Sequence, residues 1–415
     1  MNGPSIPLRG GRLPERSPLA GFWALDPATV FLNHGSFGAC PRAVFDHQAA
    51  LRVELEANPV AFLGRDLDER MERARAAVGA FFGADPDDLA FVPNATHGIA
   101  TVLRSLRLAR GDEIVANDHE YNAALNAVRA AATGAGASVS IVAIPLPVAG
   151  PEEVADRILA AVTPRTRLVL VSHVTSPTAL VFPVERLVAE LEPRGIPVLV
   201  DGAHGPGMLQ LSLDGLGASY YTGNLHKWCC GPKGAAFLHV RRDRQPGLRP
   251  LAISHGANDP RTLPVSFRKE FDWTGTADPT PFLSVPAALD IVAAMVPGGW
   301  PAVMARNAGM AREARESLLG AVGGAAIAPP QMLGAMAAIR LPSPRPLGPT
   351  QDADPLQALL RERFGFEVPV FTWPREGDQR TPRVRLVRVS AHLHNSANEF
   401  RALGDALAEV LAQGE

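Results

Sequence analysis

The sequence predicts an α/β protein with a mainly parallel seven-stranded sheet and a smaller α+β domain towards the carboxyl end. From Leu89 onwards, short apolar segments alternate with helical segments, the pattern of parallel strands covered by helices on both faces. Polar residues capable of chemistry follow several of these apolar segments. In such sheets ligands bind beyond the carboxyl ends of the strands, so these residues predict a functional site there.

The elements of the large domain are expected in a clear order. Helical periodicity runs from Arg42 to Phe82, with an interruption near Asn58 and Pro59. The expected strands of the sheet are Leu89–Val92, Glu113–Ala116, Val139–Ile144, Arg167–Ser172, Pro197–Val200, Ala218–Tyr221 and Ala235–Val240. Helices such as Pro151–Val162 and Pro183–Glu192 lie between some of them.

The composition changes near Asp278, where the smaller domain is expected to begin. Its expected helices and strands are Pro286–Met295, Val303–Gly320, Met336–Leu341, Phe366–Pro369, Val384–Val389 and Ala397–Ala412. The Pro-rich stretch Leu341–Pro355 is expected to be a loop. We therefore divide the chain into an N-terminal arm (1–30), a large domain (31–277) and a small domain (278–415), with the N-terminal segment packing on the small domain.

Composition narrows the classes of function. A chain of 415 residues is long enough for two domains, and 47% apolar with 20% charged residues is typical of a globular protein. A net charge of −2 without a basic block argues against nucleic acid and anionic membranes as partners. No apolar run reaches the ~18 residues of a membrane helix. Three cysteines cannot form a disulfide framework, so a reducing cytoplasm is the expected location.

Two neighbouring strand ends carry the most informative residues. The segment Val198–Val200 leads into Asp201 and His204, and the next βα unit leads into Lys227. An enzyme that uses pyridoxal 5'-phosphate (PLP) needs these groups together. A lysine forms a Schiff base with the PLP aldehyde, and a carboxylate keeps the pyridine nitrogen protonated, so that the ring can accept electrons.

These two segments resemble the class V aminotransferase family, in particular the branch that contains isopenicillin N epimerase and the ergothioneine C–S lyases. The resemblance runs from about Phe31 to the end of the chain. It implies the fold type I of PLP-dependent transferases, an amino-acid substrate and a homodimer with shared active sites. No metal site is predicted.

Each residue of the central group has an alternative interpretation. Lys227 is the expected Schiff-base lysine, and Lys233 in the following glycine-rich turn is its nearest competitor. Asp201 is the expected partner of the pyridine nitrogen, although an Asp at a strand end can also cap a helix. His204 is expected to contact the ring oxygen or the substrate carboxylate; alternatively, it is a hydrogen-bonded histidine near a turn.

A phosphate site is expected where Asn94–Gly98 follows a strand and precedes an apolar helical run. The start of a helix offers free N–H groups and the positive end of its dipole. The hydroxyl of Thr96 and the backbone from Ala95 to His97 are the expected donors. An ordinary N-cap is the alternative.

The resemblance adds further cofactor contacts. It implies phosphate ligands at Asn224 and His226, although the family more commonly has Ser at the former position. It also implies that Thr274–Thr276 reaches the phosphate of the partner subunit, with Thr276 as the expected contact.

An aromatic ring is expected to stack on the pyridine within the segment from Asp118 to Asn122. Tyr121 resembles the stacking residue of this branch, and His119 is the alternative. After the next strand, the hydroxyl of Thr175 or Ser176 is expected near the ring oxygen; a polar turn is the alternative.

Substrate contacts are expected from the two ends of the chain. Arg388 shares a face of its expected strand with apolar side chains, so its charge needs an anionic partner, and a planar guanidinium suits the α-carboxylate of an amino acid. A structural salt bridge is the alternative, and Arg385 is the next choice for the clamp. Asn33 and His34, within a segment that resembles the family's N-terminal signature, are expected to line the substrate side.

The implied reaction begins with removal of the α-proton by Lys227, and the following step decides the product. Isopenicillin N epimerase-like chemistry, either epimerisation or C–S/β-elimination on a modified amino acid, is the first hypothesis. A class V aminotransferase is the alternative, and a non-catalytic PLP-binding module is the third. A cysteine desulfurase with a mobile C-terminal cysteine is not expected, because the sequence has no cysteine after Cys230.

Overall fold

The computed structural model describes residues 13–342, 354–374 and 383–414. Residues 1–12 of the expected arm and most of the expected loop Leu341–Pro355 lie outside the described residues. The main sheet has seven strands in the order β2-β8-β7-β6-β5-β3-β4. Only β8 runs antiparallel to its neighbours, so the predicted α/β fold is confirmed. The strands are β2 (Leu89–Val92), β3 (Glu113–Asn117), β4 (Ser138–Val142), β5 (Thr166–Ser172), β6 (Val198–Asp201), β7 (Tyr220–Asn224) and β8 (Ala236–Val240).

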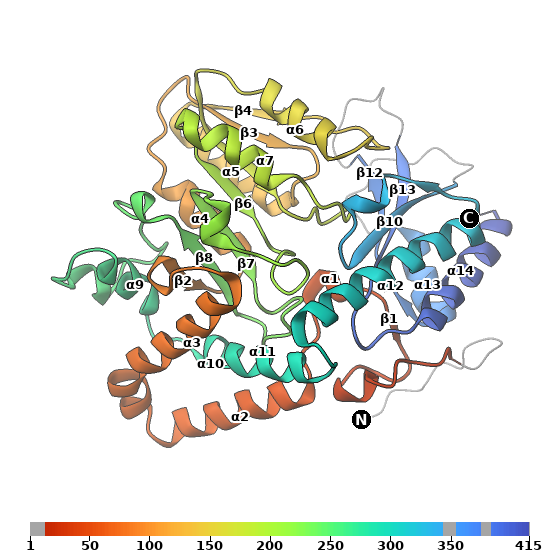
Figure 1. Ribbon diagram of the computed structural model, residues 1–415, viewed down its shortest axis with the longest axis horizontal. Helices are drawn as coiled ribbons and strands as arrows, with labels where there is room; N and C mark the ends of the chain where they lie inside the picture. Colours follow the sequence, from red (N-terminus) through yellow and green to blue (C-terminus); the bar gives the residue numbers. More distant parts are fainter. Residues whose placement is uncertain (1–12, 343–353, 375–382, 415) are drawn as a thin grey trace.

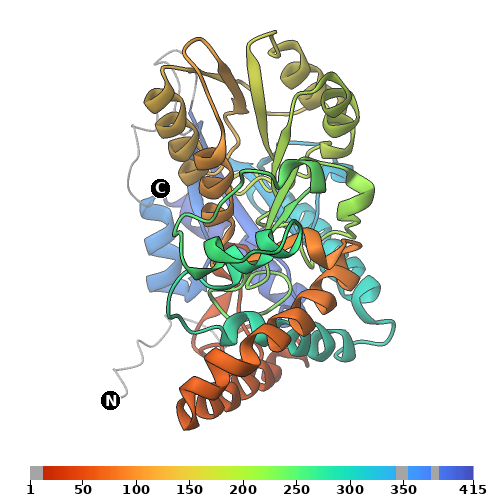
Figure 2. The same cartoon turned by 90° about the vertical axis from the view of Figure 1, so that its left-hand side faces the viewer.

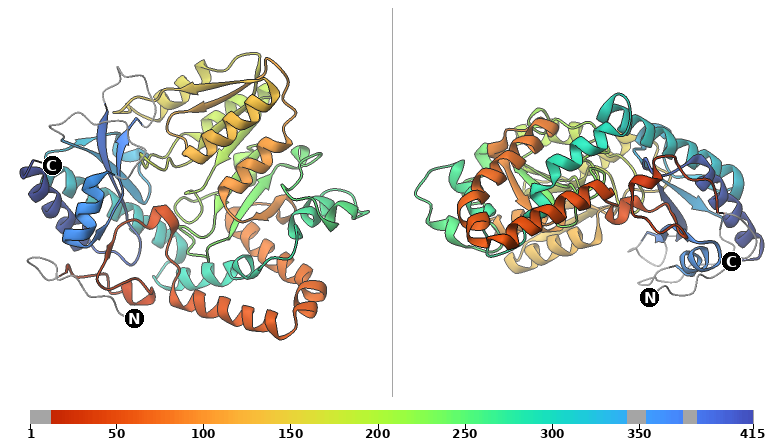
Figure 3. Two further views of the ribbon diagram at one scale, coloured as in Figure 1. Left: turned by 180° about the vertical axis from the view of Figure 1, so that it is seen from behind. Right: turned by 90° about the horizontal axis from the view of Figure 1, so that it is seen from below.

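Helices cover both faces of this sheet, because its strands alternate two sets of apolar side chains. On β5, Leu168 and Leu170 join one buried cluster, whereas Val169 and Val171 join the other. The first cluster packs under α4 (Ala95–Ser105) and α5 (Asn122–Ala135), which face the viewer in the left panel of Figure 3. The second packs under the helices α3 (Leu67–Phe82), α6 (Pro151–Ala160) and α7 (Val184–Leu191).

A second, antiparallel sheet forms the centre of the carboxyl-terminal part (Figure 1). Its strands, in spatial order, are β12 (Val370–Trp373), β13 (Val384–Ser390), β10 (Met336–Leu341) and β9 (Ala325–Ala326). Its accompanying helices are α12 (Gly299–Val322), α13 (Pro355–Phe364) and α14 (Ala397–Ala412). The short strand β1 (Val30–Phe31) pairs with β11 (Phe366–Glu367), so the start of the described chain lies beside this part. The expected boundary between the large and the small domain near residue 277 stays a prediction.

Of the remaining helices, α2 (Arg42–Ala57) lies with α3 at the lower edge of the molecule, and Figure 2 shows both towards the bottom in red to orange. As expected, the helical stretch breaks near Asn58: α2 ends at Ala57, and a π-helical segment, Ala61–Asp66, leads into α3. The further helices are α1 (His34–Phe37), α8 (Leu213–Leu216), α9 (Val265–Asp272), α10 (Thr280–Leu283) and α11 (Val285–Ala294).

No single helix among the described residues has the length and apolar composition for a membrane span. Only the bent pair Thr280–Ala294 and Gly299–Val322 meets that test, and only when the two are taken together.

The register of the central strands determines which side chains meet at the carboxyl edge. Ser172 at the end of β5 is the register partner of Asp201 at the end of β6, and Asp201 is the partner of Thr222 on β7. The expected strand Ala218–Tyr221 in fact begins at Tyr220 and continues to Asn224. The turn that carries Lys227 therefore starts beyond the end of β7, next to the ends of β5 and β6.

A buried ion pair joins α3 to α9 and gives a test of the fold. Arg75 is fully buried, pairs with the buried Asp272 and donates to the carbonyl of Leu89 at 3.0 Å. We expect Arg75→Ala to lower the free energy of unfolding by roughly 3–5 kcal/mol, because it leaves a buried carboxylate without its cation. Chemical denaturation measures this loss.

The matched control lies on the same helix. Arg73 pairs with Glu69, and both side chains are mostly exposed. Arg73→Ala should change the free energy of unfolding by about 0.5 kcal/mol or less. Equal losses in the two variants would contradict the proposed importance of the buried pair.

Candidate active site

A cavity of about 470 Å³ opens where β5, β6 and β7 end and the carboxyl-terminal sheet approaches. Its walls come from both parts of the chain. Asp201 comes from the end of β6, and Lys227 and Tyr121 from loops of the large sheet, whereas Arg388 and Phe371 come from the strands β13 and β12. Groups from distant parts of the sequence therefore meet in one partly enclosed space.

The protonation of the lysine follows from its hydrogen bonds. The indole N–H of Trp228 can only donate, so Nδ1 of His204, at 3.3 Å, must accept. Neutral His204 then carries its proton on Nε2, which lies 3.3 Å from Nζ of Lys227. That contact needs the lone pair of a neutral amine. Burial lowers the pKa of Lys227 to about 7, with Asp201 opposing and Arg388 adding to the shift, so the neutral amine is accessible near pH 7.

Asp201 forms the floor of the cavity. It is 4% exposed, and its Oδ1 accepts the N–H of Ala203 at 2.9 Å. Burial raises the pKa of this carboxyl, while the Ala203 amide and the charge of Lys227 lower it. A carboxylate in such a place needs a cationic partner, and a protonated pyridine nitrogen has the required charge.

Fewer hydrogen-bond donors are free at the expected phosphate site than the sequence suggested. The N–H of Ala95 donates to Oδ1 of Asn224, and the N–H of His97 donates to Oδ1 of the N-cap Asn94, both at 2.9 Å. His97 does not line the cavity. Within the described residues, Thr96 keeps an N–H without a partner at this helix start. The amide groups of Ala95 and His97 are thus already engaged, and Thr96 is left to bind an anion.

Two further side chains complete this end of the cavity. Because Asn224 accepts through Oδ1, its Nδ2 group remains available to donate to an anion. Nδ1 of His226 donates to the carbonyl of Ala235 at 3.1 Å, so Nε2 is the remaining nitrogen. Burial, with Lys227 adding to it, lowers the pKa of His226 to about 4, and an anion bound beside Nε2 would favour the imidazolium.

Of the two candidates for the stacking ring, Tyr121 lines the wall of the cavity and is 44% exposed. The alternative, His119, points elsewhere. Its Nδ1 contacts the hydroxyl of Thr178 at 2.7 Å, its Nε2 donates to the carbonyl of Ile144 at 2.9 Å, and it does not line the cavity. Tyr121 is therefore the ring available for stacking.

Thr175 does not lie where we expected it. Its hydroxyl is buried, accepts the N–H of Leu180 at 2.9 Å and contacts Thr178 at 2.7 Å, which closes a turn. The serines on either side, Ser172 and Ser176, line the cavity instead. Sequence spacing alone could not separate a turn-forming threonine from a serine that faces the cavity.

Arg388 projects into the cavity from β13 and is nearly fully buried. Its guanidinium donates to the carbonyl of Ser176 at 2.6 Å, to Oδ1 of Asn33 at 3.0 Å and to Oγ of Ser36 at 2.9 Å. These three acceptors fix the orientation of the guanidinium. The alternative clamp is ruled out, because Arg385 forms a buried ion pair with Asp354 at 2.8 Å.

Neither Asn33 nor His34 lines the cavity, so the structure does not place these two side chains at the substrate contact that the sequence predicted. Asn33 instead orients Arg388. His34 is fully buried, and its Nε2 donates to the backbone carbonyl of Lys227 at 3.1 Å. The adjoining Gly38 has a φ of 70°, and a Cβ there would lie 2.0 Å from the carbonyl oxygen of His226. This N-terminal segment therefore packs directly behind the lysine.

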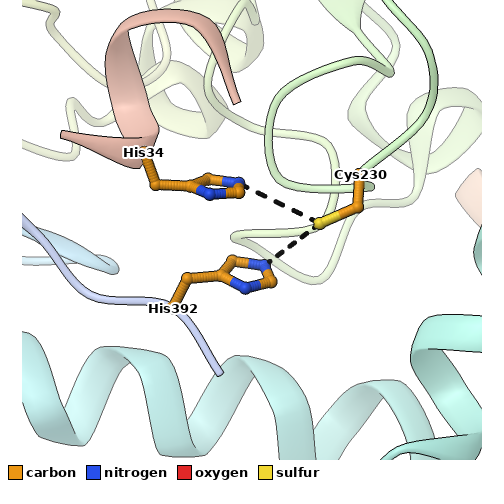
Figure 4. Close-up of side chains that lie close together, drawn as sticks. All are labelled: His34, Cys230 and His392. Carbon is orange, nitrogen blue, oxygen red and sulfur yellow. Dashed lines mark hydrogen bonds between the residues drawn. The ribbon is translucent and has the colours of Figure 1, made fainter. Parts of the chain in front are cut away.

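Figure 4 shows His34 with His392 and Cys230. The thiol lies 4.0 Å from Nε2 of His34 and 3.5 Å from Nε2 of His392. These donor types suit a soft metal ion. However, Nε2 of His34 carries the proton for the Lys227 carbonyl, and the two rings stack with an interplanar angle of 15°, so their lone pairs do not converge. The cluster supports the lysine's backbone rather than a metal.

Thr276 lies in an exposed segment and does not line the cavity of its own chain. Sequence reasoning missed several lining residues. Ser36 and Phe37 follow the N-terminal motif directly, so that motif was the available signal. Phe371 lies on β12, a strand that the sequence did not predict, and no local signal marked it.

The donor set fits PLP. Thr96 and the Nδ2 group of Asn224 can bind a phosphate, Asp201 can pair with a pyridine nitrogen, and Lys227 can react with an aldehyde. The site therefore defines a PLP-dependent enzyme. Residues 38–332 match the model of the family described as Aminotransferase class-V, and the chain belongs to that family.

Relatives cover almost the whole chain. It is 37% identical to isopenicillin N epimerase of Amycolatopsis lactamdurans over 401 residues, covering 93% of this chain and 96% of that protein. Identity to isopenicillin N epimerase of Streptomyces clavuligerus is 34%, with coverage of 92% and 95%. Identity to the probable chloroplastic L-cysteine desulfhydrase of Arabidopsis thaliana is 30%, with coverage of 94% and 84%. The resemblance predicted from the motifs is confirmed.

Solved structures confirm the expected fold type I. The cystine C–S lyase C-DES, in complex with its reaction product cysteine persulfide, matches with a TM-score of 0.77 at 22% identity, over 92% of this chain and 97% of that one. A cysteine desulfurase from Thermococcus onnurineus matches with a TM-score of 0.77 at 19% identity, over 97% and 100%. Because the neighbours include desulfurases, the fold does not separate this chain from that class.

Thr96 gives a direct test of the phosphate end. We expect Thr96→Val to weaken PLP binding by about 1.5–3 kcal/mol, because it removes a hydroxyl donor to a charged group. Equilibrium dialysis of PLP with the apoprotein measures the change in Kd. Thr101→Val on the same helix is the control, since that hydroxyl is buried without a partner among the described residues. An unchanged Kd in Thr96→Val would rule out the contact.

Proposed function

We propose that this protein is a PLP-dependent enzyme that removes the α-proton of a modified amino acid and then completes either an epimerisation or a C–S/β-elimination. The observation that carries the proposal is the buried Lys227, held as a neutral amine beside His204 and facing Asp201, with Arg388 at the other wall. An amine base, a carboxylate and a carboxylate-binding cation within one cavity suit chemistry at the α-carbon of an amino acid.

When bound, PLP supplies an electron sink that stabilises negative charge at the α-carbon. In this proposal Lys227 binds the cofactor and, once released, takes the α-proton on Nζ. Until that transfer His204 keeps Nζ in place through its Nε2 proton, and Nζ leaves this hydrogen bond to take the α-proton, because the amine has a single lone pair. Asp201 would keep a proton on the pyridine nitrogen. Arg388, kept in orientation by Asn33 and Ser176, binds the α-carboxylate through its positive charge.

The relatives support the choice between reactions. Two isopenicillin N epimerases share 37% and 34% identity with the chain, ahead of the desulfhydrases at 30% or 31%. Epimerisation is therefore our first choice and C–S/β-elimination our second. A class V aminotransferase remains the alternative within the family, since it shares the same first step. A non-catalytic module is disfavoured by the intact lysine, carboxylate and arginine.

The cysteines argue against a desulfurase that carries sulfur on a mobile cysteine. Cys40, Cys229 and Cys230 are all buried, and none of them lines the cavity. Burial raises the pKa of the Cys40 thiol to about 12, which opposes the thiolate needed for sulfur transfer. These buried free thiols are also compatible with our proposal of a reducing cytoplasm.

We also propose a homodimer in which Thr276 of one subunit reaches the phosphate end of the other site. The exposure of Thr276 and of Phe37, which is 74% exposed at the cavity wall, supports this arrangement. Sedimentation would test it: a monomer at working concentration that still holds PLP tightly would contradict a shared site.

A substrate panel tests the reaction type. Purified holoenzyme is incubated with D- and L-amino acids and with cysteine sulfoxides, while racemisation, pyruvate and ammonia are followed. Racemisation without pyruvate supports the epimerase, pyruvate with ammonia supports the lyase, and keto-acid formation that depends on a second substrate supports the aminotransferase. If none of these products forms although PLP absorption shifts on adding amino acids, the enzymatic proposal fails for these substrate classes.

Arg388 separates substrate binding from cofactor binding. Arg388→Lys retains a positive charge but loses the planar guanidinium. We expect KM for α-amino acids to rise by one to two orders of magnitude, corresponding to about 1.4–2.8 kcal/mol, with unchanged PLP absorption. Steady-state kinetics and spectroscopy measure the two effects. Arg385→Lys is the control, because that arginine pairs with Asp354. Unfolding of Arg388→Lys with unaltered KM would make Arg388 purely structural.

A further inference from the structure

A second carboxyl group lies buried beside the cavity, and the mechanism above does not use it. Glu120 follows β3 and is 3% exposed. Its Oε1 accepts from the side-chain amide of Asn117 and from the backbone N–H of Ser172, the latter at 2.9 Å. Its Oε2 contacts the hydroxyl of Ser172 at 2.5 Å. Ser172 lines the cavity, so Glu120 reaches the cavity through one hydroxyl.

These contacts show which oxygen can hold a proton. Oε1 of Glu120 faces two N–H donors, so it must be an acceptor in either protonation state. A proton on the carboxyl must therefore be on Oε2, where it is donated to the oxygen of Ser172. The hydroxyl hydrogen of Ser172 is then released towards the cavity. If Glu120 is ionised, the same hydroxyl instead points back and donates to Oε2.

The surroundings favour the acid form. Ser172 is the register partner of Asp201, so two buried carboxyls lie near the ends of adjacent strands. Burial raises the pKa of Glu120 to about 8, and the charge of Asp201 adds to the shift, against the hydrogen bonds from Ser172 and Asn117. The other titratable groups of the surrounding segments are Asp118 and His119 on the same loop, His173 after Ser172, His204 after β6, and Lys227.

We propose that Glu120 is a positioning residue that stays in its acid form, turns the hydroxyl hydrogen of Ser172 into the cavity and leaves the negative charge of this region on Asp201. The inference rests on the proposed function, because it takes the pyridine nitrogen of PLP as the partner of Asp201. In this arrangement one carboxylate faces one cationic nitrogen, and the second carboxyl acts as a neutral donor.

The matched pair Glu120→Gln and Glu113→Gln tests this inference. Glutamine keeps an acceptor at the position of Oε1 and a donor at Oε2, so it mimics the acid form permanently. Glu113 lies at the other end of β3, is also buried and accepts the hydroxyls of Thr163 and Thr166 at 2.9 and 3.0 Å. The rate at which the holoenzyme loses PLP to excess scavenger is measured from pH 7 to pH 9 for the parent and both variants.

We expect the parent and Glu113→Gln to lose PLP roughly tenfold faster at pH 9 than at pH 7, because a site that needs the acid form weakens above the pKa of that acid. Glu120→Gln should match the parent at pH 7 and show no such rise. Ser172→Ala should lose PLP several-fold faster already at pH 7. If Glu120→Gln follows the parent at high pH, or loses PLP tenfold faster at pH 7, the inference is overturned.

Two further measurements keep the outcome interpretable. If Glu120→Gln does not fold, infrared spectroscopy of the parent decides: a carboxylic-acid band that vanishes as pH passes about 8 supports the acid form, and its absence overturns it. Asp118, with a pKa raised by burial to about 6, would lose its band earlier. The ¹⁵N signal of the PLP ring in Asp201→Asn tests the proposed function separately, since an unchanged signal would refute the pyridine contact whatever Glu120 does.

Discussion

A carboxyl and an amine, those of Asp201 and Lys227, are buried at the ends of adjacent strands, and the arrangement of the site depends on this. Neither group tolerates burial alone. The register of β6 against β7 brings them to one edge of the sheet. His204 contacts the amine and is itself oriented by the indole N–H of Trp228. Exclusion of water lowers the pKa of Lys227 to about 7 against the opposing charge of Asp201, so the lysine can be neutral near pH 7 beside a carboxyl that suits a cationic partner.

The carboxyl-terminal sheet supplies an arginine side chain to the cavity that groups of the large sheet also line. The large sheet holds the groups that suit a cofactor, whereas Arg388 reaches the cavity from β13. Its hydrogen bonds to Asn33 and Ser176 connect the N-terminal segment, the loop after β5 and the small sheet through one guanidinium. Both parts of the chain thus contribute walls to one cavity.

Much of this arrangement is predictable from the sequence, since buried parallel strands are continuous apolar runs and the residues that follow them must meet at one edge. That reasoning brought Asp201, Lys227 and Tyr121 to the cavity correctly. Side chains within loops were less predictable. Thr175 and His97 are sequence neighbours of residues that line the cavity. Local hydrogen bonds nevertheless turn the hydroxyl of Thr175 away and occupy the backbone amide of His97. His34 was expected at the substrate side, but it lies behind the lysine because its ring donates to that residue's carbonyl.

The central claim is that Lys227, rather than Lys233, binds the cofactor. Both lysines line the cavity, but Nζ of Lys233 donates to the carbonyl of Gly38 at 2.9 Å, whereas Nζ of Lys227 faces His204. Borohydride reduction of the holoenzyme, followed by proteolysis and mass spectrometry, identifies the lysine that becomes covalently labelled with PLP. The account predicts label on the peptide that contains Lys227, at the position of that residue. Label on Lys233, with Lys227 unmodified, would contradict it.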